Sequence, residues 1–153
     1  MSEEILAEFQ VLIIIIFFIQ ILLWLLFANT IRKTLLLISE ENRCLLPNQA
    51  WFLAVPLFNI YWNFEVARRL ADSLNNEFFD RHIEVEESLT RRDGYFYAIT
   101  NLLAFIPFPP FWIIFFRIIS FINFVIYWFK VNKYRILLTE HNKWKAENNK
   151  NED

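Results

Sequence analysis

The sequence predicts an all-α integral membrane protein built as a four-helix bundle. Residues 11–28 form an apolar run in which Gln20 is the sole polar side chain. A helix of this length covers about 27 Å, close to the hydrocarbon thickness of a bilayer. A second run, residues 111–129, is interrupted by three polar side chains, Arg117, Ser120 and Asn123. Hydrophobic residues make up 56% of the chain, above the usual share of about 45–50% in soluble domains.

The first helix is expected over residues 5–28. Its acidic start is unlike the basic start of a secretory signal, so we expect the helix to be retained in the mature protein. The following segment, residues 31–45, has Ile31, Leu35 and Ile38 at helical spacing among charged residues. This pattern is typical of a short helix that lies in the membrane interface.

The second helix is expected over residues 48–80, after Pro47 at a helix start. Pro56 kinks it, and aromatic residues flank its apolar part, as in the aromatic belts of membrane proteins. This stretch either spans the membrane or dips in and returns, and we prefer the spanning form. Its continuation extends into the cytoplasm.

The third and fourth helices are expected over residues 94–106 and 110–141, joined as a tight hairpin. The turn between them contains three prolines in four positions, Pro107, Pro109 and Pro110, and proline stops a helix because it lacks a backbone donor. The fourth helix also extends into the cytoplasm. Residues 1–143 then form one transmembrane domain, and the polar tail, residues 144–153, is expected to be disordered.

Lysine and arginine residues predict the orientation, because they are enriched in cytoplasmic loops. Four spans place eleven of these residues on the side of both termini and three on the other side. Both termini are then cytoplasmic, in a membrane that is expected to be a bacterial inner membrane. In the alternative with a re-entrant second helix, the N-terminus lies outside and all fourteen charges are cytoplasmic.

Polar side chains in the fourth helix form one semi-polar stripe. It contains Arg117, Ser120 and Asn123. An arginine inside the bilayer costs about 2.5–3.5 kcal/mol unless it snorkels or pairs. The stripe either lines a polar pocket or binds an anionic lipid, or else it holds the bundle together. We favour the structural interpretation.

The second helix carries further candidates for such a pocket. Asn59 and Asn63 are one turn apart, and Glu65 would meet Arg117 if the second and fourth helices packed together. Amides in membrane helices more often join helices by hydrogen bonds than bind a substrate.

The cytoplasmic part of the second helix presents an apolar stripe. Its members recur every fourth residue: Val66, Leu70, Leu74 and Phe78. An apolar face outside the bilayer must be covered, either by a partner or by the matching residues Val131, Tyr134 and Leu138. Three cations of the fourth helix would meet anionic lipid headgroups. They are Lys130, Lys133 and Arg135.

The composition argues against several classes of activity. The net charge of −2 and the lack of a recognisable motif argue against nucleic-acid binding. One cysteine and two distant histidines give no metal-site spacing, and one glycine rules out the glycine-rich nucleotide loops. We therefore expect no cofactor, no metal and no catalytic residues. The predicted role is a non-enzymatic membrane scaffold or accessory subunit that binds a protein partner or itself. The alternative is a lipid- or small-solute-binding protein or a minor transporter component.

The second apolar stretch also carries a pattern, W-x4-P-x-F-N-x2-W-x-F. Its positions here are Trp51, Pro56, Phe58, Asn59, Trp62 and Phe64. In residues 42–135 the chain resembles small bacterial multi-pass membrane proteins that share this pattern. The resemblance implies an all-helical membrane fold and carries no activity. The proline-rich turn departs from the glycine-containing turn expected of those proteins.

Overall fold

The computed structural model describes residues 3–85 and 89–151, and the side chains of residues 7–85 and 89–150. Within these ranges the chain is all-α and has no strand. The elements in order are α1 (Glu3–Leu36), η1 (Glu40–Asn42), η2 (Pro47–Ala54), α2 (Phe58–Asp80), α3 (Arg91–Leu103) and α4 (Pro110–Asn151), where η denotes a 3₁₀ helix.

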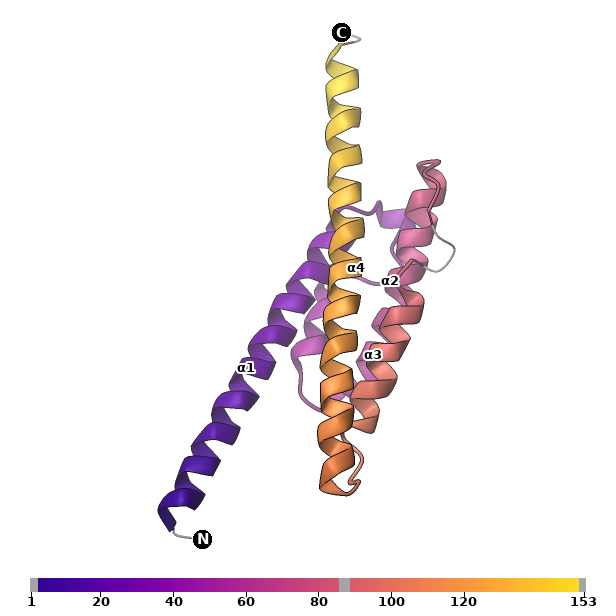
Figure 1. The fold of residues 1–153 in the computed structure, drawn as a ribbon. Coiled ribbons are helices and arrows are strands. Elements are labelled where there is room, and N and C mark those ends of the chain that lie inside the picture. The colour runs from indigo at the N-terminus through magenta and orange to yellow at the C-terminus, as the bar shows by residue number, and fades with distance from the viewer. Residues whose placement is uncertain (1–2, 86–88, 152–153) are drawn as a thin grey trace.

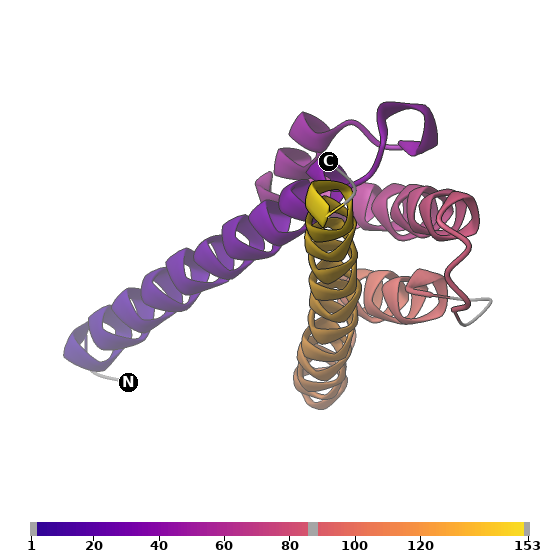
Figure 2. The same cartoon turned by 90° about the horizontal axis from the view of Figure 1, so that it is seen from above.

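The helices form a bundle with one arm that leaves it. α3 packs between α2 and α4, while α1 packs along η2 and against α4. The C-terminal half of α1 contacts the bundle, whereas its N-terminal half diverges from it in both views (Figures 1 and 2). α1, α2 and α4 run in one direction and α3 runs in the other, so the two ends of the chain lie at opposite ends of the molecule (Figure 1).

Two helices, α1 and α4, are long and apolar enough to cross a membrane, judged by length and composition. α3 has 13 residues and is about 20 Å long, shorter than the hydrocarbon core of about 30 Å, so the helix alone does not cross it and residues 104–109 would have to complete a crossing. α2 is apolar at its start and charged in its second half. The all-α prediction is confirmed for the described residues, but four membrane-spanning helices are not.

The expected helix over residues 48–80 is wrong, because the chain breaks around Pro56. Residues 47–54 form the 3₁₀ helix η2, and α2 begins at Phe58 after Leu57, which has a positive φ of 64°. Proline removes a backbone donor and disfavours the helical conformation of the preceding residue. η2 therefore descends beside α1, and the chain turns and returns as α2 (Figure 1).

The interfacial helix expected over residues 31–45 is also wrong in its bounds. α1 continues without a break to Leu36, and η1 covers Glu40–Asn42. Ile31, Leu35 and Ile38 are buried in the core, because they face the rest of the chain instead of the membrane interface.

The end of α4 differs from the expected disordered tail. α4 is helical to Asn151, and residues 152–153 lie outside the described residues. Alanine, lysine and glutamate in this segment are good helix formers, so the helix continues after its last packing contacts. The proline turn lies where it is expected, between α3 and α4.

An aromatic cluster joins α1, α3 and α4. The ring of Phe27 lies 5.2 Å from that of Phe124, 5.4 Å from that of Tyr127 and 6.5 Å from that of Tyr97, all edge to face. Such pairs contribute about 0.5–1.5 kcal/mol each beyond their buried area. This cluster anchors the C-terminal half of α1 to the bundle.

The α2 stripe, one of whose two possible roles was a partner surface, is part of this core. Its residues have 0% exposure: Val66, Leu70, Leu74 and Phe78. The Phe78 ring lies 5.8 Å from the Tyr134 ring, and Val131 and Leu138 belong to the same core. The stripe is covered from within the chain, as the alternative for this stripe expected.

Candidate functional site

Arg117 lies on the surface of α4 and not in a buried pocket. Its side chain is exposed, and its guanidinium carbon lies 6.0 Å from the centre of the Phe105 ring. Glu65 pairs instead with Arg69 at 2.7 Å and with Arg68 at 3.0 Å. The contact between Glu65 and Arg117, which was conditional on the packing of the second helix against the fourth, is not formed.

The other predicted pocket residues are mostly buried between the helices. Ser120 is buried on α4, and Asn123 donates a hydrogen bond of 3.4 Å to the Thr100 hydroxyl of α3. This bond joins two helices, as expected for a structural amide.

Asn59 and Asn63 give the bundle a polar interior. Asn59 is 0% exposed, and neither its side-chain nitrogen nor its oxygen has a hydrogen-bond partner; the Asn63 side-chain nitrogen is also unpaired. The side chains of Trp24 and Asn63 approach the hydroxyl of Tyr97. Polar groups from α1, α2 and α3 thus meet inside the molecule, whereas Arg117 is exposed on α4.

The three predicted headgroup cations have different surroundings. Lys130 forms a half-buried ion pair of 2.8 Å with Asp93 of α3. Lys133 is exposed near the Tyr134 ring. Arg135 is half-buried, and its Nε atom is buried without a hydrogen-bond partner. Lys130 therefore joins two helices, whereas Arg135 keeps an unused donor.

A buried ionic network that the sequence analysis missed is centred on Glu77 of α2. One carboxylate oxygen accepts hydrogen bonds from the backbone N–H of Ser39 at 3.0 Å, from the Ser39 hydroxyl and from the Asn42 amide at 2.9 Å. The other oxygen accepts from Arg81 Nε at 2.8 Å and Nη2 at 2.6 Å. We call these four residues the Glu77 network.

Arg81 connects the network to both long helices. Its Nη2 donates to the Leu37 carbonyl at 3.1 Å, just after α1. Its Nη1 donates to the Asn142 oxygen at 2.6 Å and lies 3.1 Å from His141 Nδ1, both on α4. The charge-bearing ends of α1, α2 and α4 are thus held together by one guanidinium.

These contacts set the ionisation of Glu77. Burial raises the pKa of its carboxyl group, but the hydrogen bonds from Ser39, Asn42 and Arg81 lower it more, to about 2. The carboxylate therefore stays ionised at neutral pH. In the sequence, the network is indicated only by the i,i+4 spacing of Glu77 and Arg81. Glu65 and Arg69 have the same spacing but are more exposed, so the spacing alone does not identify a buried network.

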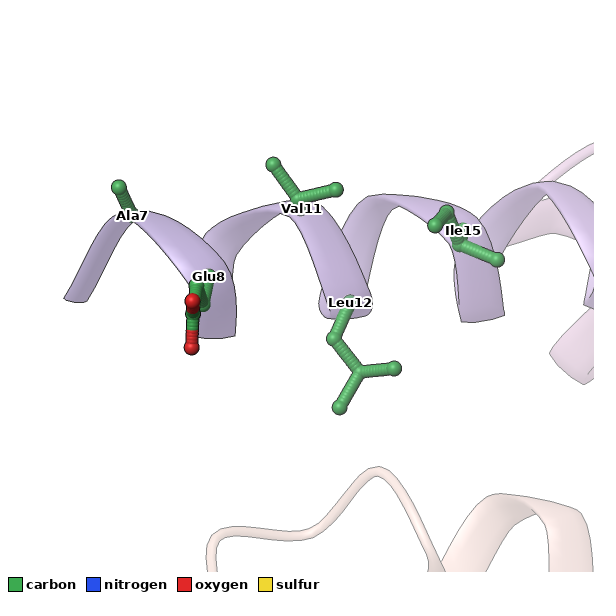
Figure 3. Close-up of a pocket in the computed structure, with 5 residues that line it drawn as sticks. All are labelled: Ala7, Glu8, Val11, Leu12 and Ile15. Atoms are coloured by element: carbon green, nitrogen blue, oxygen red, sulfur yellow. The ribbon is translucent and has the colours of Figure 1, made fainter. Parts of the chain in front are cut away.

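The hollow along the start of α1 is a bare helix surface. It is lined by Ala7, Glu8, Val11, Leu12 and Ile15. All five side chains come from one helix and point in different directions (Figure 3). Such a surface encloses nothing and offers no convergent polar groups.

A second hollow, about 360 Å³ in volume, lies between α1 and α4. It is lined by Thr30, Val125, Trp128, Phe129 and Asn132. Trp128 Nε1 donates a hydrogen bond of 3.0 Å to the Thr30 hydroxyl, which itself donates to the Leu26 carbonyl at 3.0 Å. This groove combines apolar walls with polar groups from two helices.

Metal chemistry has no apparent site in the described part of the chain, where no three histidine, cysteine, aspartate or glutamate side chains gather. No protein-family model, curated protein or solved structure matches the chain. The family resemblance suggested by the sequence pattern is therefore not confirmed.

Proposed function

We propose that the protein is a non-enzymatic integral membrane scaffold or accessory subunit, anchored by α1 and α4. The observation that carries the proposal is the N-terminal half of α1. Its large apolar side chains from Phe9 to Ile19 are all exposed, between 49% and 65%, and no other part of the described chain covers them. Exposing such an apolar surface to water is unfavourable in free energy, whereas contact with the hydrocarbon of a membrane avoids this cost.

The direction of the helices supports the re-entrant topology. α1 and α4 both run from the side of the proline turn to the side that carries the charges, η2 turns back before α2, and α3 with residues 104–109 returns the chain to the side of the proline turn (Figure 1). All fourteen lysine and arginine residues outside Arg117 then lie on the cytoplasmic side, and the N-terminus lies outside. In this orientation Arg117 lies about two turns into the hydrocarbon, from where its long side chain reaches the outer headgroups.

The single cysteine tests this topology directly, because Cys44 is exposed. We expect a membrane-impermeant maleimide to leave Cys44 unlabelled in intact cells and to label it after lysis. In a Cys44→Ser background, Glu3→Cys serves as the external control and is labelled in intact cells. Labelling of Cys44 from outside would instead support four spans with both termini inside.

The part of the chain best placed to bind a partner is the α4 extension, which we define as residues 143–151. It stands clear of the other helices (Figure 1), and its described side chains are exposed. Trp144 is 59% exposed and lies beside His141, with ring centres 5.8 Å apart. Tryptophan is enriched among the residues that dominate binding energy at protein interfaces. This helix replaces the α2 stripe as the proposed contact surface.

Two measurements test the proposal. First, the full chain stays in the membrane pellet during alkaline carbonate extraction; release into the supernatant would contradict an integral membrane protein.

The second measurement tests the contact surface. In a Cys44→Ser background, Lys145→Cys is expected to give bismaleimide cross-links in native membranes, and these cross-links disappear when Trp144→Ala is added. Phe79→Cys, at an exposed position of α2 on the same side, is the matched control and gives none. Absence of any Lys145→Cys product would contradict the scaffold role.

A further inference from the structure

The groove between α1 and α4 lies where the apolar part of each helix ends. Thr30 follows the apolar run of α1 by two residues, and Phe129 is the last residue of the apolar run of α4. Both helices continue from there into their charged segments. If α1 and α4 cross the membrane as proposed, the groove lies at the cytoplasmic interface, at the depth of lipid headgroups and the first acyl carbons.

The helices separate on the hydrocarbon side of this groove. From the Thr30–Trp128 hydrogen bond, α1 and α4 diverge toward the other end of the molecule (Figures 1 and 2). Leu22 and Leu26 precede Thr30 on α1, Phe121 precedes Val125 on α4, and all three side chains are exposed. We call the region between the diverging helices the wedge; the apolar side chains of both helices there would offer an acyl chain apolar contacts.

The water side of the groove is positively charged. Lys33 follows Thr30 by three residues on α1, and Arg135 follows Asn132 by three residues on α4. Residues three apart lie on the same face of a helix, so both cations lie one turn beyond the groove. The buried Nε atom of Arg135 has no hydrogen-bond partner. No acidic residue occurs in residues 9–36 or 110–139, so neither helix supplies a counter-charge there.

We infer that the groove binds one anionic phospholipid. Its phosphate lies between Lys33 and Arg135 and accepts a hydrogen bond from the guanidinium, and one acyl chain occupies the wedge between α1 and α4. Arginine binds phosphate oxygens with charge-assisted hydrogen bonds. The inference rests on the proposed membrane placement and adds a specific ligand to it, independent of any partner of the α4 extension.

The test uses the full chain in nanodiscs of phosphatidylcholine with increasing phosphatidylglycerol, followed by native mass spectrometry of the released protein. We expect one phosphatidylglycerol molecule retained per chain, in preference to phosphatidylcholine. Each cation near a headgroup contributes about 1 kcal/mol, so Arg135→Gln and Lys33→Gln each weaken retention about fivefold. Val125→Phe narrows the groove without changing charge and also reduces retention.

Lys133→Gln is the matched control, because Lys133 lies at the same depth on α4 but about 100° away from Asn132 around the helix. It leaves retention unchanged. Equal loss with Lys133→Gln, or equal retention of both lipids, would show general attraction to headgroups and overturn the site. A lipid-free dimer would show that a second copy fills the groove. If Val125→Phe fails to fold, Arg135→Gln and Lys33→Gln still test whether the groove binds the lipid. Release of the protein by carbonate would contradict the membrane proposal itself, which distinguishes that failure from failure of the lipid site.

Discussion

Replacing Glu77 with glutamine is expected to destabilise the protein by about 3–5 kcal/mol, the usual cost of removing one partner from a buried ion pair. The Glu77 side chain is 4% exposed and that of Arg81 is 15% exposed. The neutral amide would leave the guanidinium of Arg81 without its counter-charge. It would also turn a donor group toward Ser39 and Asn42, which now donate to the carboxylate. Thermal unfolding of the detergent-purified protein measures the loss.

The chain offers a matched control for this substitution. Glu65 also lies on α2 and also pairs with an arginine four residues later, at 2.7 Å. Its partners, Arg68 and Arg69, are 52% and 37% exposed, and pairs with one exposed member contribute about 1 kcal/mol or less. Glu65→Gln therefore has a small effect. Equal losses for the two variants would mean that the Glu77 network does not hold α1, α2 and α4 together.

The same network predicts how stability depends on pH. The pKa of Glu77 is about 2 in the folded protein, below the value of 4.5 for a free carboxyl group. A lowered pKa stabilises the folded state above the pKa of the unfolded chain, and this contribution disappears as the pH falls through the folded value. The wild-type protein is expected to lose about 3 kcal/mol from this group between about pH 5 and pH 2. The Glu77→Gln variant has no carboxyl group at this position and should lose less stability over this pH range, as measured by thermal unfolding at each pH. If the stability of the variant depended on pH as steeply as that of the wild type, Glu77 would not be the group responsible.

The parts of the fold that follow from local composition were predicted from the sequence. The apolar runs of α1 and α4 and the proline turn depend on a hydrophobic length and on a missing backbone donor, and both are properties of short segments. The break at Pro56 was less predictable, because a proline in a membrane helix either kinks or ends it. The packing of η2 on α1, which depends on residues far apart in sequence, favours the break.

The candidate site was harder to predict because burial decides the role of each polar residue. Glu65 and Glu77 have the same spacing to an arginine, and only tertiary packing makes one of them the centre of a network. Arg117 is a candidate because it is a charge in an apolar run, but the structure places it at the surface and not in a pocket. Arg135 looks like an ordinary interfacial cation, and the burial of its unpaired Nε atom is visible only in the folded structure.

Replacing Gly94, the single glycine of the chain, with alanine is expected to cost about 1–3 kcal/mol of stability. A Cβ atom at this position would lie 2.7 Å from the Cβ of Ala67 and 3.0 Å from the Cζ of Tyr127. α3 therefore approaches α2 and α4 more closely than a methyl group allows. At an open helix position the same change would stabilise the protein by up to about 1 kcal/mol, so the sign of the effect reports the close contact. Gly94→Leu is expected to cost more, because its side chain must displace both neighbours.

A double-mutant cycle with Ala67 isolates the contact behind this loss. Ala67→Gly removes the atom nearest to the new methyl group, so the double variant, Ala67→Gly with Gly94→Ala, recovers part of the stability that Gly94→Ala loses. The recovery is incomplete because the Cα of Ala67, at 3.1 Å, and Tyr127 remain close. Residues in contact give interaction energies of about 0.5–3 kcal/mol in such cycles. Purely additive effects in thermal unfolding would mean that α2 and α3 do not meet at Gly94, and the packing of the bundle proposed to support α1 and α4 would then be wrong.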